Sequence, residues 1–230
     1  MTPLLSVIIP ARNEAAALPW LLADLAPLRA AGAELIVVDG GSRDATAELA
    51  VAQADKVLET SAGRALQLNA GAAVARADYL WFVHADTRVS AASIQRLLAV
   101  LAERPIWGRF DVRLSGSGLA LRLIGTMINL RSRLTGVATG DQGIFVARES
   151  FEALGGYAEI PLMEDIELSG RLKRRVRPRC LRPALSTSSR RWERDGIWRT
   201  VLLMWRLRLA YSCGASPDQL ARRYHRGPPL

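Results

Sequence analysis

The chain has 230 residues, 50% of them hydrophobic and 23% charged, so it is long and apolar enough to fold around a substantial core. Its net charge of +9 is uneven, because residues 1–170 carry −4 and residues 171–230 carry +13. Two cysteines are too few for a disulfide framework, and no apolar run reaches the roughly 18 residues of a transmembrane helix, so we expect neither, and no signal peptide.

The first hundred residues alternate between strand-like and helix-like patterns. Short apolar runs predict buried strands at 4–9, 34–38, 56–58 and 79–83. Apolar residues at helical spacing predict helices at 15–31, 42–54, 63–75 and 90–102. Strands that alternate with helices of this length indicate βαβ units around a parallel sheet, which is an α/β fold.

The regular alternation stops near Arg104-Pro105. Beyond it the patterns predict an edge strand at 107–114, a helix at 119–134, a short strand at 143–146 and a helix at 164–174. We therefore expect one domain over 1–190 and a basic helical extension over 191–230.

The extension contains a segment, 192–211, in which Trp, Leu and Arg recur at helical spacing. This pattern is typical of an amphipathic helix at a membrane surface, and a helix packed on the body of the protein would look the same. The clustered positive charge could also contact nucleic acid, but the segment contains no recognised nucleic-acid module and its Trp and Leu content suits a lipid interface or a core better. We therefore expect no nucleic-acid partner.

Three acidic signals follow the predicted strands or open a predicted helix. Asp39 follows the second strand, His84-Ala85-Asp86 follows the fourth, and Glu164-Asp165 begins the helix at 164–174. An Asp just past the carboxyl end of a parallel strand lies where open α/β sheets bind their ligands. Together these signals predict a nucleotide–metal site with a general base.

Taken together, the motifs resemble family 2 glycosyltransferases, which have the GT-A fold. The segments that carry the resemblance are 7–14 (VIIPARNE), 37–46 (VVDGGSRDAT), 82–86 (FVHAD) and 163–168 (MEDIEL), and it spans residues 4 to about 175. Two more segments, 63–72 (GRALQLNAGA) and 140–143 (GDQG), resemble a bacterial subgroup associated with radical-SAM/selenodomain proteins, some of which are labelled arsenosugar-biosynthesis glycosyltransferases. The resemblance implies a mostly parallel sheet flanked by helices. It also implies inverting, metal-dependent transfer of a sugar from a nucleoside-diphosphate sugar, UDP-linked, to an unidentified acceptor hydroxyl.

The resemblance also implies which residues bind the nucleotide. Asp39 would accept the imide N–H of uracil, and Arg64 would bind phosphate oxygens. The loop after the first strand would wrap the nucleoside, and the residues assigned there are Pro10, Ala11, Arg12 and Glu14. Asp39 could instead bond its own turn, and Arg64 could be a surface residue.

Asp86 is the expected ligand of Mn²⁺ or Mg²⁺, because one carboxylate with phosphate and water oxygens can hold such an ion. His84 stands where the family commonly has an Asp. With Ala85 it is assigned to the nucleotide, although His84 could also act through a water or as a structural donor.

Asp165 is the expected base that takes the proton from the acceptor hydroxyl, and Glu164 is its neighbour. Both could instead be carboxylates stabilised at a helix N-terminus. Asp141 and Gln142 lie between two glycines, where we expect contact with sugar or acceptor, or a plain tight turn.

Two other classes of protein remain as alternatives. A sugar-nucleotide pyrophosphorylase would share the α/β architecture, but the loop at 10–14 lacks the glycines of its phosphate loop. A non-enzymatic protein could bind nucleic acid or membrane through the basic tail. The predicted location is cytoplasmic, with peripheral contact to an anionic membrane at the inner face of the cell membrane.

Overall fold

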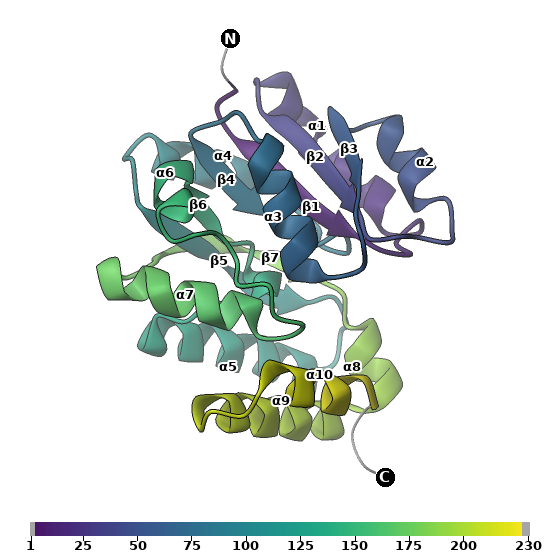
Figure 1. Ribbon diagram of the computed structural model, residues 1–230, viewed down its shortest axis with the longest axis vertical. Coiled ribbons are helices and arrows are strands. Elements are labelled where there is room, and N and C mark those ends of the chain that lie inside the picture. The colour runs from purple at the N-terminus through teal and green to yellow at the C-terminus, as the bar shows by residue number, and fades with distance from the viewer. Residues whose placement is uncertain (1–2, 227–230) are drawn as a thin grey trace.

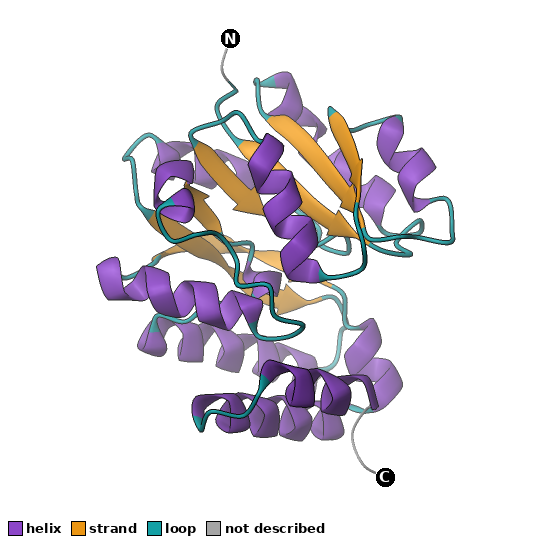
Figure 2. Cartoon of the chain, viewed as in Figure 1, coloured by secondary structure: helices purple, strands orange, loops and turns teal. Residues whose placement is uncertain are grey.

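The computed structural model describes residues 3–226, without the side chains of Arg191, His225 and Arg226. Seven strands form one sheet in the order β3-β2-β1-β4-β6-β5-β7. Every neighbouring pair is parallel except those of β6, which runs antiparallel to β4 and β5. The strands are β1 (Ser6–Ala11), β2 (Glu34–Asp39), β3 (Lys56–Glu59), β4 (Tyr79–Phe82), β5 (Trp107–Leu114), β6 (Phe145–Ala147) and β7 (Arg179–Thr187). Helices lie on both faces of this sheet, which confirms the predicted mostly parallel α/β architecture (Figure 2).

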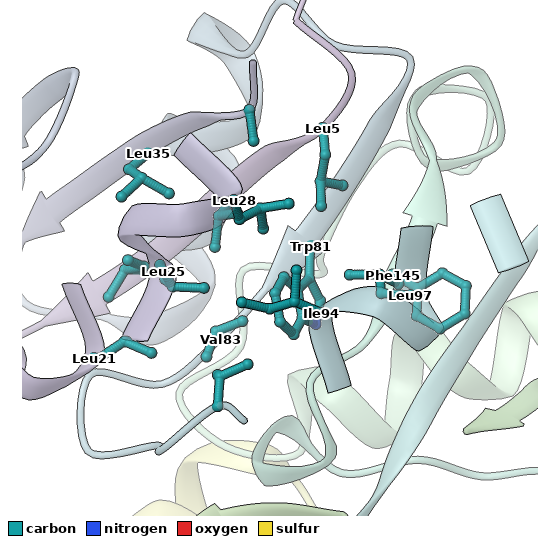
Figure 3. Close-up of a cluster of buried hydrophobic side chains, with 14 of the residues drawn as sticks. Leu5, Leu21, Leu25, Leu28, Leu35, Trp81, Val83, Ile94, Leu97 and Phe145 are labelled. Carbon is teal, nitrogen blue, oxygen red and sulfur yellow. The ribbon is translucent and has the colours of Figure 1, made fainter. Parts of the chain in front are cut away.

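One face of the sheet is covered by α1 (Leu18–Ala30) and α4 (Ala91–Leu101). The five leucines of α1 on the predicted apolar face are all buried, and they are Leu18, Leu21, Leu22, Leu25 and Leu28. Trp81 of β4 lies in this cluster between the side chains of the two helices, with Ile94 and Leu97 of α4 beside it (Figure 3). Burying such side chains stabilises the fold by about 1.5–3 kcal/mol each.

The other face is covered by α3 (Arg64–Val74), α6 (Arg148–Glu152) and α7 (Glu164–Arg175) (Figure 1). Helix α3 lies very close to the sheet at Gly71, where an added Cβ would be 2.5 Å from Ile8 Cγ2 and 3.1 Å from Val38 Cγ2. A side chain at this position would therefore push the helix off β1 and β2.

A buried carboxylate joins β1, β2 and the segment before β4. Glu34 is 2% exposed, and its Oε1 accepts hydrogen bonds from Ser6 Oγ at 2.6 Å and from the Arg76 amide at 2.6 Å. The Arg76 guanidinium adds a bond at 3.1 Å. Burial opposes the ionised form, but these hydrogen bonds and the Arg76 charge outweigh it, so the pKa of Glu34 lies below its usual value.

The predicted edge strand is wrong in its position. Strand β5 is an inner strand, because β7 pairs with it in parallel from Gly108–Arg179 to Leu114–Thr187. The sequence pattern missed β7 because its segment carries Arg179, Arg182 and Pro183, which read as a charged and broken stretch. An edge strand tolerates such residues, since one row of its backbone groups is not paired with another strand, so the missing N–H of a proline breaks no ladder there.

Three helices form the C-terminal part of the described chain: α8 (Arg190–Asp195), α9 (Ile197–Ser212) and α10 (Pro217–Arg226). On one side of α9, Leu203 and Leu207 pack with Met163 and Leu220. A second small cluster joins α8 and α9 to α5 (Leu119–Thr135). The two remaining helical segments are α2 (Thr46–Val51) and the 3-10 turn η1 (Gly140–Gln142). Within residues 3–226, no helix is both long and apolar enough to cross a membrane.

The Glu34 cluster gives a test of the fold. Replacing Glu34 by Gln should reduce the free energy of unfolding at pH 7 by about 1–3 kcal/mol, because charge-assisted bonds to Ser6 and to the Arg76 amide are weakened. The bond to the Arg76 side chain, which is 62% exposed, contributes little.

The effect should depend on pH. Since the folded pKa of Glu34 is depressed, its contribution is present above the unfolded value of about 4.5 and is lost as pH falls below it. Urea unfolding of both proteins at pH 7 and in the acid range should show the gap closing in acid. Glu59→Gln, at an exposed position on β3, is the matched control, and an equal loss there would contradict the assignment.

Candidate functional site

The carboxyl ends of β1 and β2 are joined by one buried side chain. Gln67 of α3 is 5% exposed, and its Nε2 donates to the carbonyl oxygens of Ala11 at 2.9 Å and Val38 at 2.8 Å. An added Cβ on Gly40 would lie 2.9 Å from the Gln67 amide carbon, so only glycine lets the chain turn here without displacing this side chain. Gln67 thus fixes the edge of the sheet on which the predicted site lies.

The loops that follow β1 and β2 are bonded to each other. The Asn13 amide donates to Ser42 Oγ at 2.9 Å, and Asn13 Oδ1 accepts from the Arg43 amide at 2.8 Å. The Glu14 amide donates to Thr46 Oγ1 at 2.8 Å. The predicted nucleoside loop, of which Pro10 and Ala11 end β1 while Arg12 and Glu14 follow it, is therefore held beside the Asp39 turn.

Asp39 ends β2 and is 4% exposed. Its Oδ2 accepts the amides of Gly41 at 3.1 Å and Ser42 at 2.8 Å, and its Oδ1 accepts the Ser42 hydroxyl. These are the bonds of a residue that closes its own turn. Oδ2 already accepts two amides, but Oδ1 accepts only one hydroxyl and keeps a second lone pair, so the turn leaves Asp39 able to accept one more N–H.

A second acidic group lies where β4 ends. Asp86 Oδ2 is 3.7 Å from Arg190 Nη2, which also binds Glu14 Oε2 at 2.8 Å. Burial and the charges of Glu14 and Asp141 raise the pKa of Asp86, whereas Arg190 lowers it. The carboxylates of Asp86, Glu14 and Asp141 thus form a region that favours a cation. The guanidinium of Arg190, on α8, is a positive charge in that region.

The acidic region around Asp86 is the place where a divalent metal ion could bind. The carboxylate of Asp86 is 26% exposed and has the oxygen chemistry that Mg²⁺ and Mn²⁺ prefer. In the described part of the chain, no three His, Cys, Asp or Glu side chains are grouped closely enough to hold a metal alone. The residues therefore fit an ion held by Asp86 with oxygens from water and a bound diphosphate.

The third acidic signal begins α7. Asp165, in the first turn of α7, accepts a hydrogen bond through Oδ2 from the Gly140 amide at 2.7 Å. An added Cβ on Gly140 would be 2.6 Å from His84 Nε2 and 3.7 Å from Asp165 Oδ2, so the three residues pack without room for another side chain. Burial, with the nearby Arg64 charge, lowers the pKa of His84 to about 3, so its imidazole is neutral.

Arg64 and Glu164 form an ion pair across 100 residues of sequence, with Nη1 and Oε1 3.1 Å apart. Glu164 is 2% exposed, and burial together with the Asp165 charge raises its pKa even though Arg64 opposes the shift. Burial lowers the pKa of Arg64, but Glu164 and Asp165 raise it above its usual range. The guanidinium is 43% exposed, so Arg64 binds Glu164 and still presents donors to solvent.

Asp141 and Gln142, the two residues between glycines, differ in how deeply they are buried. Gln142 is fully buried, its Oε1 accepts the Thr139 amide at 3.2 Å, and its Nε2 donates to the Phe110 carbonyl at 3.4 Å. Gln142 therefore stabilises the turn. Asp141 is half-buried, and its Oδ1 is shielded from solvent without a hydrogen-bond partner, so it can accept a further hydrogen bond.

Sequence reasoning gave no site role to four residues of this region. Tyr157, 2% exposed, lines a small enclosed cavity with Arg64, His84 and Asp165. Asn69 fixes the Tyr157 backbone through two bonds of 2.9 Å. Gln67 and Asn69 belong to the 63–72 motif, and that motif was the sequence signal that could have identified them. Nothing in the local sequence distinguished Arg190 from the many other arginines of the tail.

Comparison with known proteins gives a consistent result. A model of the family described as glycosyl transferase family 2 matches residues 6–153. The comparison with curated proteins found no match. Among solved structures, the chain is similar to Staphylococcus aureus TarS 1–349 in complex with UDP-GlcNAc, with 18% identity and a TM-score of 0.66 over 80% of this chain and 58% of that one.

The same TarS fragment without ligand gives 17% identity and a TM-score of 0.64, over 86% of this chain and 64% of that one. The mannosyltransferase PcManGT from Pyrobaculum calidifontis, in complex with GDP-Man and Mn²⁺, gives 18% identity and a TM-score of 0.63 over 97% and 69% of the two chains. This chain thus spans 58–64% of the length of the TarS fragment. At such identities the similarity establishes the GT-A fold.

Proposed function

The chain belongs to glycosyl transferase family 2, and we propose that it moves a sugar from a nucleoside-diphosphate sugar to an acceptor hydroxyl with inversion at the anomeric carbon. The observation that carries the proposal is that Asp39, Asp86 and Asp165, far apart in sequence, lie along one edge of the sheet, with Arg64 beside Asp165. This is where a parallel sheet receives a ligand. The narrower resemblance to the radical-SAM-associated subgroup stays a prediction.

The donor is proposed to lie across the ends of β1, β2 and β4. Its base would bond to Asp39, its ribose would face the loop of Pro10 to Glu14, and its diphosphate would lie between Asp86 and Arg64. Two of the solved neighbours are complexes, one with UDP-GlcNAc and the other with GDP-Man and Mn²⁺. We propose UDP for this chain because a carboxylate accepts the single imide N–H of uracil directly.

A divalent ion, when bound at Asp86, would neutralise charge on the leaving diphosphate. The protein's own residues complete the environment. Arg64 offers guanidinium N–H groups to phosphate oxygens. His84, neutral and packed against Gly140, would meet the nucleotide with an uncharged ring.

Asp165 is proposed as the base that accepts the proton of the acceptor hydroxyl. Its Oδ2 already takes the Gly140 N–H, which fixes the orientation of the carboxylate, and the start of α7 stabilises its negative charge. Glu164 cannot take this role as directly, because it is buried and its carboxylate is bound by Arg64. Glu164 is therefore a positioning residue that holds Arg64 beside the base.

The extension at 191–230 is proposed to attach the protein to an anionic membrane surface. Helix α9 exposes Trp198, Leu202, Trp205 and Leu209 along one stripe, at 48–69% of their full areas. Helix α5, which packs with α8 and α9, exposes a second stripe made of Leu119, Leu123, Met127, Leu130 and Leu134. Exposed Arg199 and Arg206 flank the α9 stripe, and they complement anionic headgroups.

The first test of the donor site is calorimetric titration of UDP and of GDP, each with and without Mn²⁺. We expect the wild-type protein to bind UDP more tightly with Mn²⁺ and to prefer UDP to GDP. In Asp86→Ala, the increase in UDP affinity that Mn²⁺ produces should be at least tenfold smaller than in the wild type. The reason is that the Asp86 carboxylate is the protein's contribution to holding the ion. A preference for GDP would reject the uracil argument, and unchanged binding by Asp86→Ala would reject Asp86 as the ligand.

The test of the base uses UDP release from UDP-hexoses with water as the acceptor. Asp165→Asn should bind UDP as the wild type does and should release it about 10²–10⁴-fold more slowly, which is the usual contribution of a general base. Glu167→Gln, in the same turn of α7, is the control and should leave release unchanged. Strong residual release by Asp165→Asn would remove this residue from the role.

Membrane attachment is tested by flotation with vesicles of phosphatidylglycerol and phosphatidylcholine. Trp198→Ser combined with Trp205→Ser should reduce binding at least tenfold, and added salt should reduce wild-type binding through the arginines. The same change at a buried position would disturb the fold, so Val51→Ser, an exposed apolar residue on α2, is the control. Equal flotation of the double variant and wild type would contradict the proposal.

A further inference from the structure

A cavity lined by arginines lies beside β7, the edge strand of the sheet. Its volume is about 340 Å³, and it is lined by Arg96 of α4, Arg133 of α5, and Cys180 and Arg182 of β7. A second cavity of about 370 Å³ shares the first two arginines and the cysteine, and it also reaches Arg179. Guanidinium groups from three elements thus surround a space that is wide enough for a phosphate group.

The positive charge around this cavity is only partly neutralised. Oδ2 of the buried Asp111 accepts hydrogen bonds from Arg133 Nη2 at 2.8 Å and from Arg182 Nε at 2.7 Å, and Oδ1 accepts one from Arg109. Burial opposes the ionised form of Asp111, but these bonds outweigh it and hold its pKa below the usual value. One carboxylate is therefore shared by three guanidinium groups. Arg96 adds a further positive charge, because it is exposed and has no ion-pair partner in residues 3–226.

The arginines of the cavity also keep N–H groups for a ligand. The Nε of Arg133 is shielded from solvent and has no hydrogen-bond partner. Arg182 is 76% exposed, and among the described residues only its Nε is bonded, so its terminal N–H groups are free. Of the lining arginines, only Arg179 has a carboxylate to itself, that of Glu103. Phosphate oxygens accept several such N–H groups at once, and a phosphate monoester supplies close to two negative charges at pH 7.

The cavity is separated from the proposed donor site by most of the length of β7. Cys180 lies near the start of this strand, where it pairs with the start of β5. Near the other end, Ser186 pairs with Arg88, which follows Asp86 by two residues. A strand rises about 3.3 Å per residue, so Cys180 and Ser186 are about 20 Å apart. A small ligand in the cavity would therefore not touch a donor bound at Asp86.

We propose that this cavity is a second anion site, which binds a phosphate group through Arg96, Arg133 and Arg182. The phosphate can belong to a free phosphate monoester or to the headgroup of an anionic lipid. A lipid is one of the two sources because Leu134, next to Arg133 on α5, is exposed and belongs to the apolar stripe of that helix. The site is independent of the sugar transfer proposed above.

The two free cysteines provide the experiment. Cys180 lines the cavity and is half-buried, whereas Cys213, at the end of α9, is exposed and serves as an internal control. The full chain is alkylated with iodoacetamide, with and without glycerol 1-phosphate at constant ionic strength, and the rate at each cysteine is followed by mass spectrometry of its peptide. A phosphate held by the arginines should slow alkylation of Cys180 and leave that of Cys213 unchanged.

Variants of the lining arginines test which groups hold the phosphate. Arg96→Met and Arg182→Met should each raise the glycerol 1-phosphate concentration for half-maximal protection by about tenfold, since each removes a charge-assisted hydrogen bond. Arg96 is exposed and does not bind Asp111, so its variant should fold as the wild type does. Arg222→Met, at an exposed position on α10, is the matched control and should be protected like the wild type. UDP binding should be the same in all of these proteins, and its failure would reject the donor site without affecting the alkylation result.

Vesicles of phosphatidylcholine, with and without phosphatidic acid, form the second arm. Protection of Cys180 by glycerol 1-phosphate indicates that the site takes a free phosphate monoester. Protection only by the vesicles that contain phosphatidic acid indicates a lipid headgroup. The proposal is overturned if neither probe protects Cys180, if the wild type and Arg96→Met are protected equally, or if glycerol 1-phosphate slows Cys213 as much as Cys180.

Discussion

The antiparallel strand β6 is the constraint on which the candidate site depends. It pairs with β4 from Tyr79–Ala147 to Trp81–Phe145, and the Phe82 amide donates to the Ile144 carbonyl at 2.9 Å. Because β6 runs opposite to its neighbours, its first residues lie at the edge where the other strands end. The η1 turn before β6 is thereby held against the segment after β4, and Gly140 meets both His84 and Asp165. A parallel strand in this place would put that turn at the far edge of the sheet.

Much of the fold could be predicted from the sequence because its first half has strong local periodicity. The leucines of α1 and the apolar runs of β1, β2 and β4 each contain their own signal. The sequence could also indicate that Asp39 and Asp86 follow strands that end at one edge. It could not indicate β7, whose Arg182 and Pro183 are accepted only because that strand lies at the edge. Nor could it locate Arg190, whose importance comes from Glu14 and Asp86 lying near it in space.

The charge asymmetry of the chain is partly an internal arrangement. Arginines of the basic C-terminal part form ion pairs with acidic residues of the body, and the pairs are Arg179–Glu103, Arg182–Asp111 and Arg190–Glu14. All three involve exposed arginines and contribute little stability, but they orient the elements that carry them. The sequence suggests that the positive charge of the tail is free to bind a polyanion. Part of that charge instead holds β7 and α8 against acidic residues of the body.

The two neighbouring carboxylates of α7 show how one helix start can give different roles to adjacent residues. Glu164 is buried, paired with Arg64, and has a raised pKa, so its charge is maintained by that one cation. Asp165 is held instead by the Gly140 amide, on a turn fixed by β6. Arg64 cannot move far toward a phosphate without leaving Glu164 unpaired, which is costly in a buried site. A donor phosphate that binds Arg64 must therefore come to the existing ion pair. That requirement fixes the distance between the leaving group and the carboxylate that would receive the acceptor's proton.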